Sequence, residues 1–269
     1  MSLWYETIAE GDESSELNDL VLLHGWGMNS AVWQPLLGQL QSVFRVTLID
    51  LPGHGYSQEG HSQASKLVNG SLEEWVTAIE AELPDKSILL GWSLGGLVAL
   101  KLALNNPDKL SGVILMTATP SFMQRDDWAC AMEKNTLENF AKNLKENTKS
   151  TLNRFLSLQI QGCDDARNLL KQLKSGFSAR PQAQQHALET GLSFLHDVDI
   201  RDEVAGLSVP SLWVYGEKDT LVPACSSEEI INHLPGATVK QIKGAGHVPF
   251  LSHMNETLQE IINWKQANV

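Results

Sequence analysis

Short apolar runs alternate along the chain with longer amphipathic stretches. The apolar runs cover residues 3–8, 20–23, 44–49, 87–90, 110–116, 211–215 and 238–242. Runs of this length predict strands, and those with few polar positions predict strands that are buried on both faces. Helical stretches lie between them, at residues 29–40, 71–82 and 97–104, and another follows residue 253. The alternation predicts an α/β fold with a mostly parallel central sheet flanked by helices.

Residues 121–190 break this alternation. We find no convincing strand there, and helical segments are expected at 137–144, 151–160 and 165–173. A purely helical block between two strand-rich blocks predicts an inserted cap above the mouth of a site. We therefore expect a core formed by residues 1–120 and 191–269, with a helical cap at 121–190.

Composition narrows the class of protein. The 269 residues are 42% hydrophobic and 19% charged, with a net charge of −12. No apolar run approaches the ~20 residues that span a bilayer, and the negative charge argues against nucleic-acid binding. The first residues lack a signal-peptide pattern. We expect a soluble, cytoplasmic monomer that acts on small esters.

Three cysteines are scattered along the chain at positions 130, 163 and 225. Their odd number and irregular spacing indicate neither a disulfide framework nor a metal site. We expect all three to be packing residues in a protein of a reducing compartment.

The run at 87–90 ends in Gly-Trp-Ser-Leu-Gly, and a helical stretch follows at once. This pattern is typical of a nucleophile elbow, a sharp turn that lifts a serine above the sheet. Glycine is needed at Gly91 and Gly95 because a side chain there would collide with a neighbouring strand or helix. The pattern predicts Ser93 as the nucleophile. An ordinary glycine-rich connection between a strand and a helix is the alternative.

A second glycine-rich loop, His24-Gly25-Trp26-Gly27, follows the strand at 20–23. In an α/β-hydrolase this position supplies one backbone N–H of the oxyanion hole, and the residue after the nucleophile supplies the other. The predicted donors are therefore the N–H groups of Trp26 and Leu94. For His24 we expect a structural role, with its ring hydrogen-bonded to the loop.

Two loops in the last third of the chain contain the other candidate catalytic residues. Asp219 follows the strand at 211–215, and His247 lies between glycines just after the strand at 238–242. The order Ser, Asp, His along the chain matches this fold. His247 would accept the proton of Ser93, and Asp219 would orient and stabilise the imidazole. Asp219 as an ordinary turn residue is the alternative, and we interpret Asp50, in the Asp-Leu-Pro-Gly loop, as architecture.

These groups predict acyl transfer through a covalent ester, and nothing in the sequence calls for a metal or another cofactor. The expected cap holds ten Lys or Arg against eight acidic residues, whereas the remainder is strongly acidic. This charge is either a solvated helix surface or a landing site for an acidic partner.

Several stretches together resemble the BioH family of pimeloyl-acyl-carrier-protein methyl ester carboxylesterases, which act in biotin synthesis. They are Gly-Trp-Gly within 22–27, Asp-Leu-Pro-Gly at 50–53, Gly-Trp-Ser-Leu-Gly-Gly within 90–99 and Arg-Phe-Leu-Ser-Leu-Gln at 154–159. The resemblance implies an acyl-carrier protein as partner, which would meet Arg154, Arg167 and Lys171. The implied substrate contacts are Trp26, Ser93, Leu94, Phe155, Leu156, Ser157, Leu158, Gln159 and His247.

Alternatives remain open at this point. Phe155 and Leu158 could be the buried stripe of a cap helix, and Trp26 and Trp92 could be core aromatics. The activity could also be that of a broad short-chain carboxylesterase without a protein partner, or of a carbon–carbon bond hydrolase of the meta-cleavage type. A binding module without catalysis is a further alternative.

Overall fold

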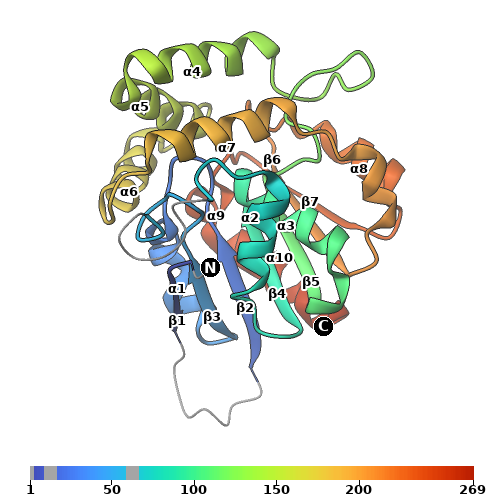
Figure 1. Ribbon diagram of the computed structural model, residues 1–269. Coiled ribbons are helices and arrows are strands. Elements are labelled where there is room, and N and C mark those ends of the chain that lie inside the picture. Colours follow the sequence, from blue (N-terminus) through green and yellow to red (C-terminus); the bar gives the residue numbers. More distant parts are fainter. Residues whose placement is uncertain (1–2, 9–16, 59–66) are drawn as a thin grey trace.

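A mostly parallel sheet forms the centre of the protein, which a computed structural model describes over residues 3–8, 17–58 and 67–269. Within these residues the sheet has seven strands in the order β1-β3-β2-β4-β5-β6-β7 (Figure 1). β1 runs antiparallel to β3, and the other neighbours are parallel. The strands are β1 (Tyr5–Ile8), β2 (Asn18–Leu23), β3 (Phe44–Ile49), β4 (Ser87–Trp92), β5 (Leu110–Met116), β6 (Ser211–Gly216) and β7 (Thr238–Ile242). The expected α/β architecture is confirmed.

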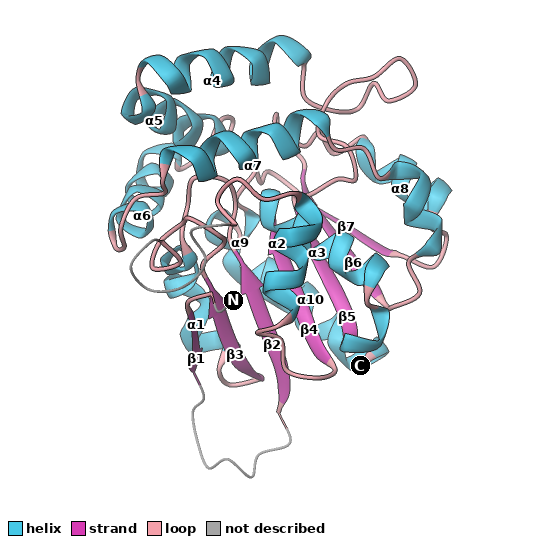
Figure 2. Cartoon of the chain, viewed as in Figure 1, coloured by secondary structure: helices cyan, strands magenta, loops and turns pink. Residues whose placement is uncertain are grey.

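Helices cover both faces of the sheet (Figure 2). Along β2, Leu20 and Leu22 pack into one hydrophobic cluster and Val21 and Leu23 into the other. The first cluster includes side chains of α1 (Gln34–Leu40) and α10 (Met254–Asn268), and the second includes those of α2 (Leu72–Glu80) and α3 (Leu94–Asn105). Because successive strand residues point to opposite faces, a strand covered on both sides is apolar throughout.

A further layer of helices lies over the carboxyl ends of the parallel strands (Figure 1). It consists of α4 (Lys134–Glu146), α5 (Thr148–Gln159), α6 (Ala166–Ser178) and α7 (Gln185–Asp197). The chain enters it after β5 and returns to the sheet at β6. The three expected helical segments fall in α4, α5 and α6, whereas the expected boundary at residue 190 falls inside α7.

Two of the cysteines are paired, which corrects the expectation that all three only fill space. Cys130, in the segment between β5 and α4, forms a disulfide with Cys225, just before α8 (Ser226–His233), with the Cα atoms 5.7 Å apart. Cys163 is a free, buried thiol. The partners are 95 residues apart, so only the tertiary fold brings them together. No helix in the described part of the chain is long and apolar enough to cross a membrane.

The disulfide should stabilise the folded protein. Replacing Cys130 by Ser should lower the free energy of unfolding by about 2–4 kcal/mol, because the cross-link restricts the unfolded chain. Denaturant unfolding with and without a thiol reductant measures this. Reductant should destabilise the wild type to the same extent and leave Cys130→Ser unchanged. Identical wild-type curves in both conditions would contradict the prediction.

Candidate active site

Ser93 occupies the turn between β4 and α3. Its backbone has φ 55° and ψ −118°, a conformation that residues other than glycine rarely adopt and that often marks a functional site. The two flanking glycines make the turn possible. A Cβ on Gly91 would collide with the carbonyl oxygen of Gly95, and a Cβ on Gly95 would collide with that of His24. The steric reason expected for these glycines is confirmed.

Three side chains meet at the carboxyl ends of the parallel strands. Ser93 follows β4, Asp219 follows β6 and His247 follows β7. The Oγ atom of Ser93 lies 2.9 Å from Nε2 of His247. Nδ1 of His247 lies 2.8 Å from Oδ2 of Asp219. All three residues are buried, with His247 only 1% exposed, so the contacts are sheltered from water.

The loop after β6 fixes the carboxylate of Asp219. Its Oδ1 atom accepts the N–H of Leu221 at 2.8 Å and that of Val222 at 3.0 Å. These bonds occupy one oxygen and orient the other toward His247. Asp219 is therefore a turn residue and a partner of the imidazole at the same time, and the two interpretations drawn from its position do not exclude each other.

The backbone of His247 is held from three sides. Its carbonyl oxygen accepts the indole N–H of Trp92 at 2.9 Å and the hydroxyl of Thr117 at 3.0 Å. Its own N–H donates to the carbonyl oxygen of Gln159 at the end of α5. Sequence reasoning missed Thr117. Its position directly after β5, the strand beside β4, was the available signal.

The loop after β2 and the first residue of α3 both adjoin Ser93. The loop that carries Trp26 packs against the serine, because a Cβ built on Gly25 would lie 3.3 Å from Cβ of Ser93. Leu94 follows the serine and begins α3. Among the described residues, no acceptor takes the N–H of Trp26 or of Leu94. Both residues are buried.

The helical layer covers these groups with apolar side chains. The rings of Trp26 and Phe155 make an edge contact at 4.8 Å between centroids. The indole N–H of Trp26 donates to the carbonyl oxygen of Leu188 on α7 at 2.8 Å. A Cβ on Gly191 would lie 2.9 Å from a methyl group of Leu94. α5 and α7 thus close directly over the loop and the elbow.

The α5 residues expected to contact substrate point in different directions. Phe155 faces Trp26, whereas Leu156 packs into the opposite hydrophobic cluster. Leu158 is half-buried, and Gln159 is buried with no hydrogen-bond partner for Oε1 among the described residues. Ser157 is exposed, and its hydroxyl donates to the backbone of Asn153. The structure therefore does not bring Ser157 to the site.

Four basic residues of the helical layer differ in their exposure to solvent. Arg154 on α5 and Arg167 and Lys171 on α6 are exposed. We find no ion pair between them and any acid in the described ranges. Arg180, between α6 and α7, is different. Its side chain is 7% exposed and pairs with Asp50, so it adds nothing to the open positive surface.

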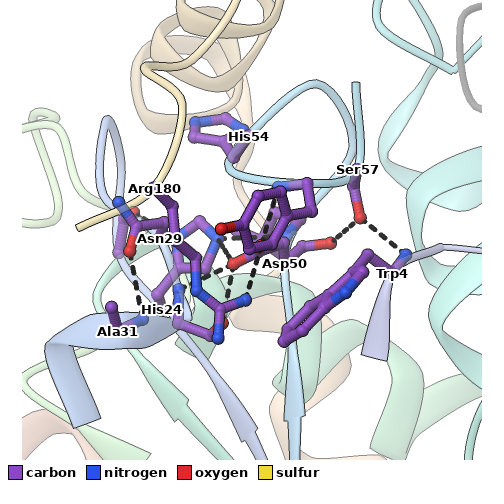
Figure 3. A network of polar contacts seen from close by, with 12 residues as sticks. Trp4, His24, Asn29, Ala31, Asp50, His54, Ser57 and Arg180 are labelled. Atoms are coloured by element: carbon purple, nitrogen blue, oxygen red, sulfur yellow. Dashed lines mark hydrogen bonds and ion pairs between the residues drawn. The ribbon is translucent and has the colours of Figure 1, made fainter. Parts of the chain in front are cut away.

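Asp50 and His24 form a buried polar centre beneath the site (Figure 3). Burial alone would raise the pKa of Asp50. The pKa is nevertheless lowered by the nearby His24, the N–H groups of Ser30 and Tyr56, and the Arg180 guanidinium. Burial lowers the pKa of His24, whose Nδ1 bonds to the carbonyl oxygen of Gly25. These contacts agree with the structural roles expected for both residues.

Burial keeps the side chains of His54 and Cys163 neutral. Burial lowers the pKa of His54 to about 3, so this ring is uncharged at neutral pH. Burial also raises the pKa of the Cys163 thiol. Histidines 186 and 233 are exposed, histidines 196 and 253 are half-exposed, and position 61 lies outside the described residues. In the part of the chain that the structure describes, no cluster of residues could hold a metal ion.

The arrangement can activate a hydroxyl group. An imidazole 2.9 Å from Ser93 Oγ is placed to accept its proton as the oxygen attacks an acyl carbon. The carboxylate of Asp219 would then stabilise the imidazolium that forms. The geometry therefore suits the cleavage of an ester through a covalent intermediate.

Replacing Asp219 by Asn should lower kcat for p-nitrophenyl butyrate by roughly 10⁴-fold. The amide can still accept the two loop N–H groups, but it stabilises the wrong tautomer of His247. Asp164→Asn is the control, because that side chain is 95% exposed, and it should keep wild-type kcat. If Asp219→Asn retains more than about a tenth of wild-type kcat, the carboxylate does not act through the imidazole.

Solved structures of other proteins share this fold. An esterase from Exiguobacterium antarcticum has a TM-score of 0.83 at 24% identity, over 97% of this chain and 94% of that one. An enol-lactonase from Burkholderia xenovorans has a TM-score of 0.80 at 17% identity, over 98% and 96%. At these identities the likeness concerns the fold alone.

Sequence relatives are closer. The family model described as alpha/beta hydrolase fold matches residues 19–254. A pimeloyl-[acyl-carrier protein] methyl ester esterase of Aliivibrio salmonicida is 38% identical over 265 residues, or 98% of this chain and 96% of the relative. An esterase of the same name from Aeromonas hydrophila is 42% identical over 243 residues, or 90% and 93%. The chain therefore belongs to the alpha/beta hydrolase fold family and, within it, to the family of pimeloyl-[acyl-carrier protein] methyl ester esterases.

Proposed function

We propose that the protein is a serine carboxylesterase with Ser93 as nucleophile, His247 as general base and Asp219 as the orienting acid. The observation that carries this proposal is the unbroken chain of hydrogen bonds from Ser93 Oγ through the imidazole to the carboxylate. A serine hydroxyl is a weak nucleophile at neutral pH, and an adjacent base that removes its proton overcomes this weakness.

The N–H groups of Trp26 and Leu94 would bind the oxyanion of the tetrahedral intermediate. Three observations support this role. Trp26 and Leu94 are buried, their N–H groups have no acceptor among the described residues, and the loop that carries Trp26 packs against Ser93. Each such donor contributes roughly 3 kcal/mol to the stability of the transition state. The N-terminus of α3 adds a partial positive charge at the same place.

The reaction would proceed in two halves. Ser93 Oγ attacks the ester carbon, and His247 passes the serine proton to the departing alcohol oxygen, which releases the alcohol and leaves an acyl ester on Ser93. Water then attacks this ester while His247 accepts its proton, and the same proton returns to Ser93 as the carboxylate leaves. No residue is consumed in the cycle.

We further propose the methyl ester of pimeloyl-acyl-carrier protein as the substrate, with free pimeloyl-carrier protein and methanol as products, in biotin biosynthesis. The names of relatives that are 38% and 42% identical over nearly the whole chain support this. The apolar cover formed by Trp26, Phe155 and Leu188 suits an acyl chain. Because α5 and α7 lie over Ser93, we propose that α4 to α7 form a cap. The sheet and its flanking helices then form the core.

Arg154, Arg167 and Lys171 are the proposed contacts with the carrier. An exposed cation that forms no ion pair with an acid can attract a negatively charged partner, which sets orientation and association rate. One chain supplies every group named here, and we propose that it acts as a monomer. A carrier-bound substrate also suggests the cytoplasm. The disulfide gives no support to a reducing compartment, so the proposed location rests on the substrate.

Two substrates test this function, pimeloyl-carrier-protein methyl ester and p-nitrophenyl butyrate. Ser93→Ala should abolish turnover of both. The triple variant Arg154→Glu, Arg167→Glu, Lys171→Glu should lower kcat/KM at least tenfold for the carrier-bound ester only, since it reverses the charge of the docking face. A Lys86→Glu, Lys109→Glu double variant, at the amino ends of β4 and β5, is the control and should leave both activities unchanged.

Equal turnover of both substrates, with a triple variant that matches the wild type, would remove the partner from this proposal. The protein would then be a broad short-chain carboxylesterase.

A further inference from the structure

Arg180 is a charged side chain in an unusual place. It lies between α6 and α7, yet only 7% of the side chain is exposed. Its Nη1 donates to Oδ2 of Asp50 at 3.0 Å, and Nη2 lies 3.6 Å from Glu6 of β1. The guanidinium also stacks on the ring of Trp4, with Cζ 3.8 Å from the centroid, and lies 5.1 Å from the centroid of Tyr56 (Figure 3). The helical layer thus inserts one buried cation into the core.

Asp50, the acceptor, holds the far end of the Trp26 loop. It follows β3 and is fully buried. Its Oδ1 accepts both the N–H and the hydroxyl of Ser30, each at 2.7 Å. Its Oδ2 accepts the N–H of Tyr56 at 2.9 Å as well as the Arg180 donor. Ser30 begins the short 3₁₀ helix Ser30–Trp33 that follows the loop.

The next residue along the chain holds the near end of the same loop. The N–H of Leu51 donates to Nε2 of His24 at 3.0 Å. Residues 24–30 are therefore fixed at both ends by the corner formed by Asp50 and Leu51. Trp26 lies between these anchors.

Two other contacts seat the α6–α7 segment on this corner. The side-chain amide of Asn29 donates to the carbonyl oxygen of Phe177 at 3.2 Å. The N–H of Gln184 donates to the carbonyl oxygen of Gly53 at 2.9 Å. These are neutral bonds, so Arg180 is the charged member of the contact.

We propose that Arg180 is a positioning residue that couples the seating of the cap to the oxyanion-binding loop through Asp50. The inference rests on the proposed function, because it assumes that the Trp26 N–H binds the oxyanion. When the cap is seated, the guanidinium balances the buried carboxylate, and Asp50 holds Ser30 in place. Without Arg180, the carboxylate would be buried without a cationic partner, and it would take up water or a proton at the expense of Ser30.

The chemistry of the side chain suits this role. A planar guanidinium can bond to Asp50 and stack on Trp4 at once, whereas an ammonium offers a point charge without the stack. Lysine at position 180 should therefore restore the charge but only part of the geometry.

The experiment compares Arg180→Met and Arg180→Lys with Lys174→Met, which removes an exposed cation from α6 and leaves the corner intact. The substrate is p-nitrophenyl butyrate, which needs no carrier. Arg180→Met should lower kcat by about 10–100-fold, less than the loss of an oxyanion donor, with KM changed less than threefold or so. Arg180→Lys should keep kcat within about fivefold of the wild type. Lys174→Met should match the wild type.

A double-mutant cycle with Asp50→Asn tests whether the effect of Arg180 on kcat depends on the carboxylate of Asp50. In the Asp50→Asn background no carboxylate needs a partner, so Arg180→Met should lower kcat by less than about threefold further. In the single variant Arg180→Met, the pKa of Asp50 should rise, because one cation is lost while burial persists. The acid limb of kcat should therefore move to higher pH. The other titratable groups near this pair, His24, His54, Tyr56 and Glu6, are the same in every variant.

The outcomes separate the two proposals. Equal factors for Arg180→Met in both backgrounds, or a pure rise in KM, would overturn the coupling through Asp50. Wild-type kcat in a folded Arg180→Met would overturn it as well, and Arg180→Gln, which also removes the charge, serves the same comparison if the Met variant does not fold. Turnover by Ser93→Ala would instead overturn the proposed function. Circular dichroism and thermal unfolding confirm that each variant is folded at the assay temperature.

Discussion

The turn at Ser93 is the constraint on which the rest of the structure depends. Its positive φ and the absence of side chains at Gly91 and Gly95 allow β4, α3 and the loop after β2 to approach more closely than any other residue permits. This approach places the loop that carries Trp26 against the serine. At the same carboxyl edge of the sheet, the loops after β6 and β7 bring Asp219 and His247 within hydrogen-bond distance of their partners.

The helical layer takes part in this geometry as well as covering it. A carbonyl oxygen at the end of α5 accepts the backbone N–H of His247, and a carbonyl oxygen of α7 accepts the indole N–H of Trp26. Arg180, between α6 and α7, donates to the carboxylate of Asp50. His247 and the loop that carries Trp26 are therefore each in contact with the helical layer. Under the proposed function, a partner that docks on this layer would act on the same elements that position these groups.

The sheet, its flanking helices and the positions of Ser93, Asp219 and His247 in the loops after their strands could be predicted from the sequence, because they depend on local patterns. Apolar runs mark the strands, and Gly-x-Ser-x-Gly marks the elbow. Features that depend on tertiary contact could not be predicted. The Cys130–Cys225 pair spans 95 residues. The hydroxyl of Thr117, after β5, contacts the backbone of His247, after β7. In the sequence, Arg180 cannot be told from an exposed cation. Ser157 was expected to contact substrate and does not reach the site, because a family pattern does not tell which face of α5 a residue occupies.

Under the proposed function, Ser93 carries the acyl group. Reaction with a fluorophosphonate, followed by peptide mass spectrometry, tests it most directly, because this reagent bonds to a serine activated by a neighbouring base. We expect a single adduct on the peptide that contains Ser93, and its loss in His247→Ala. An adduct on another residue, or labelling of Ser93 that persists without His247, would contradict it.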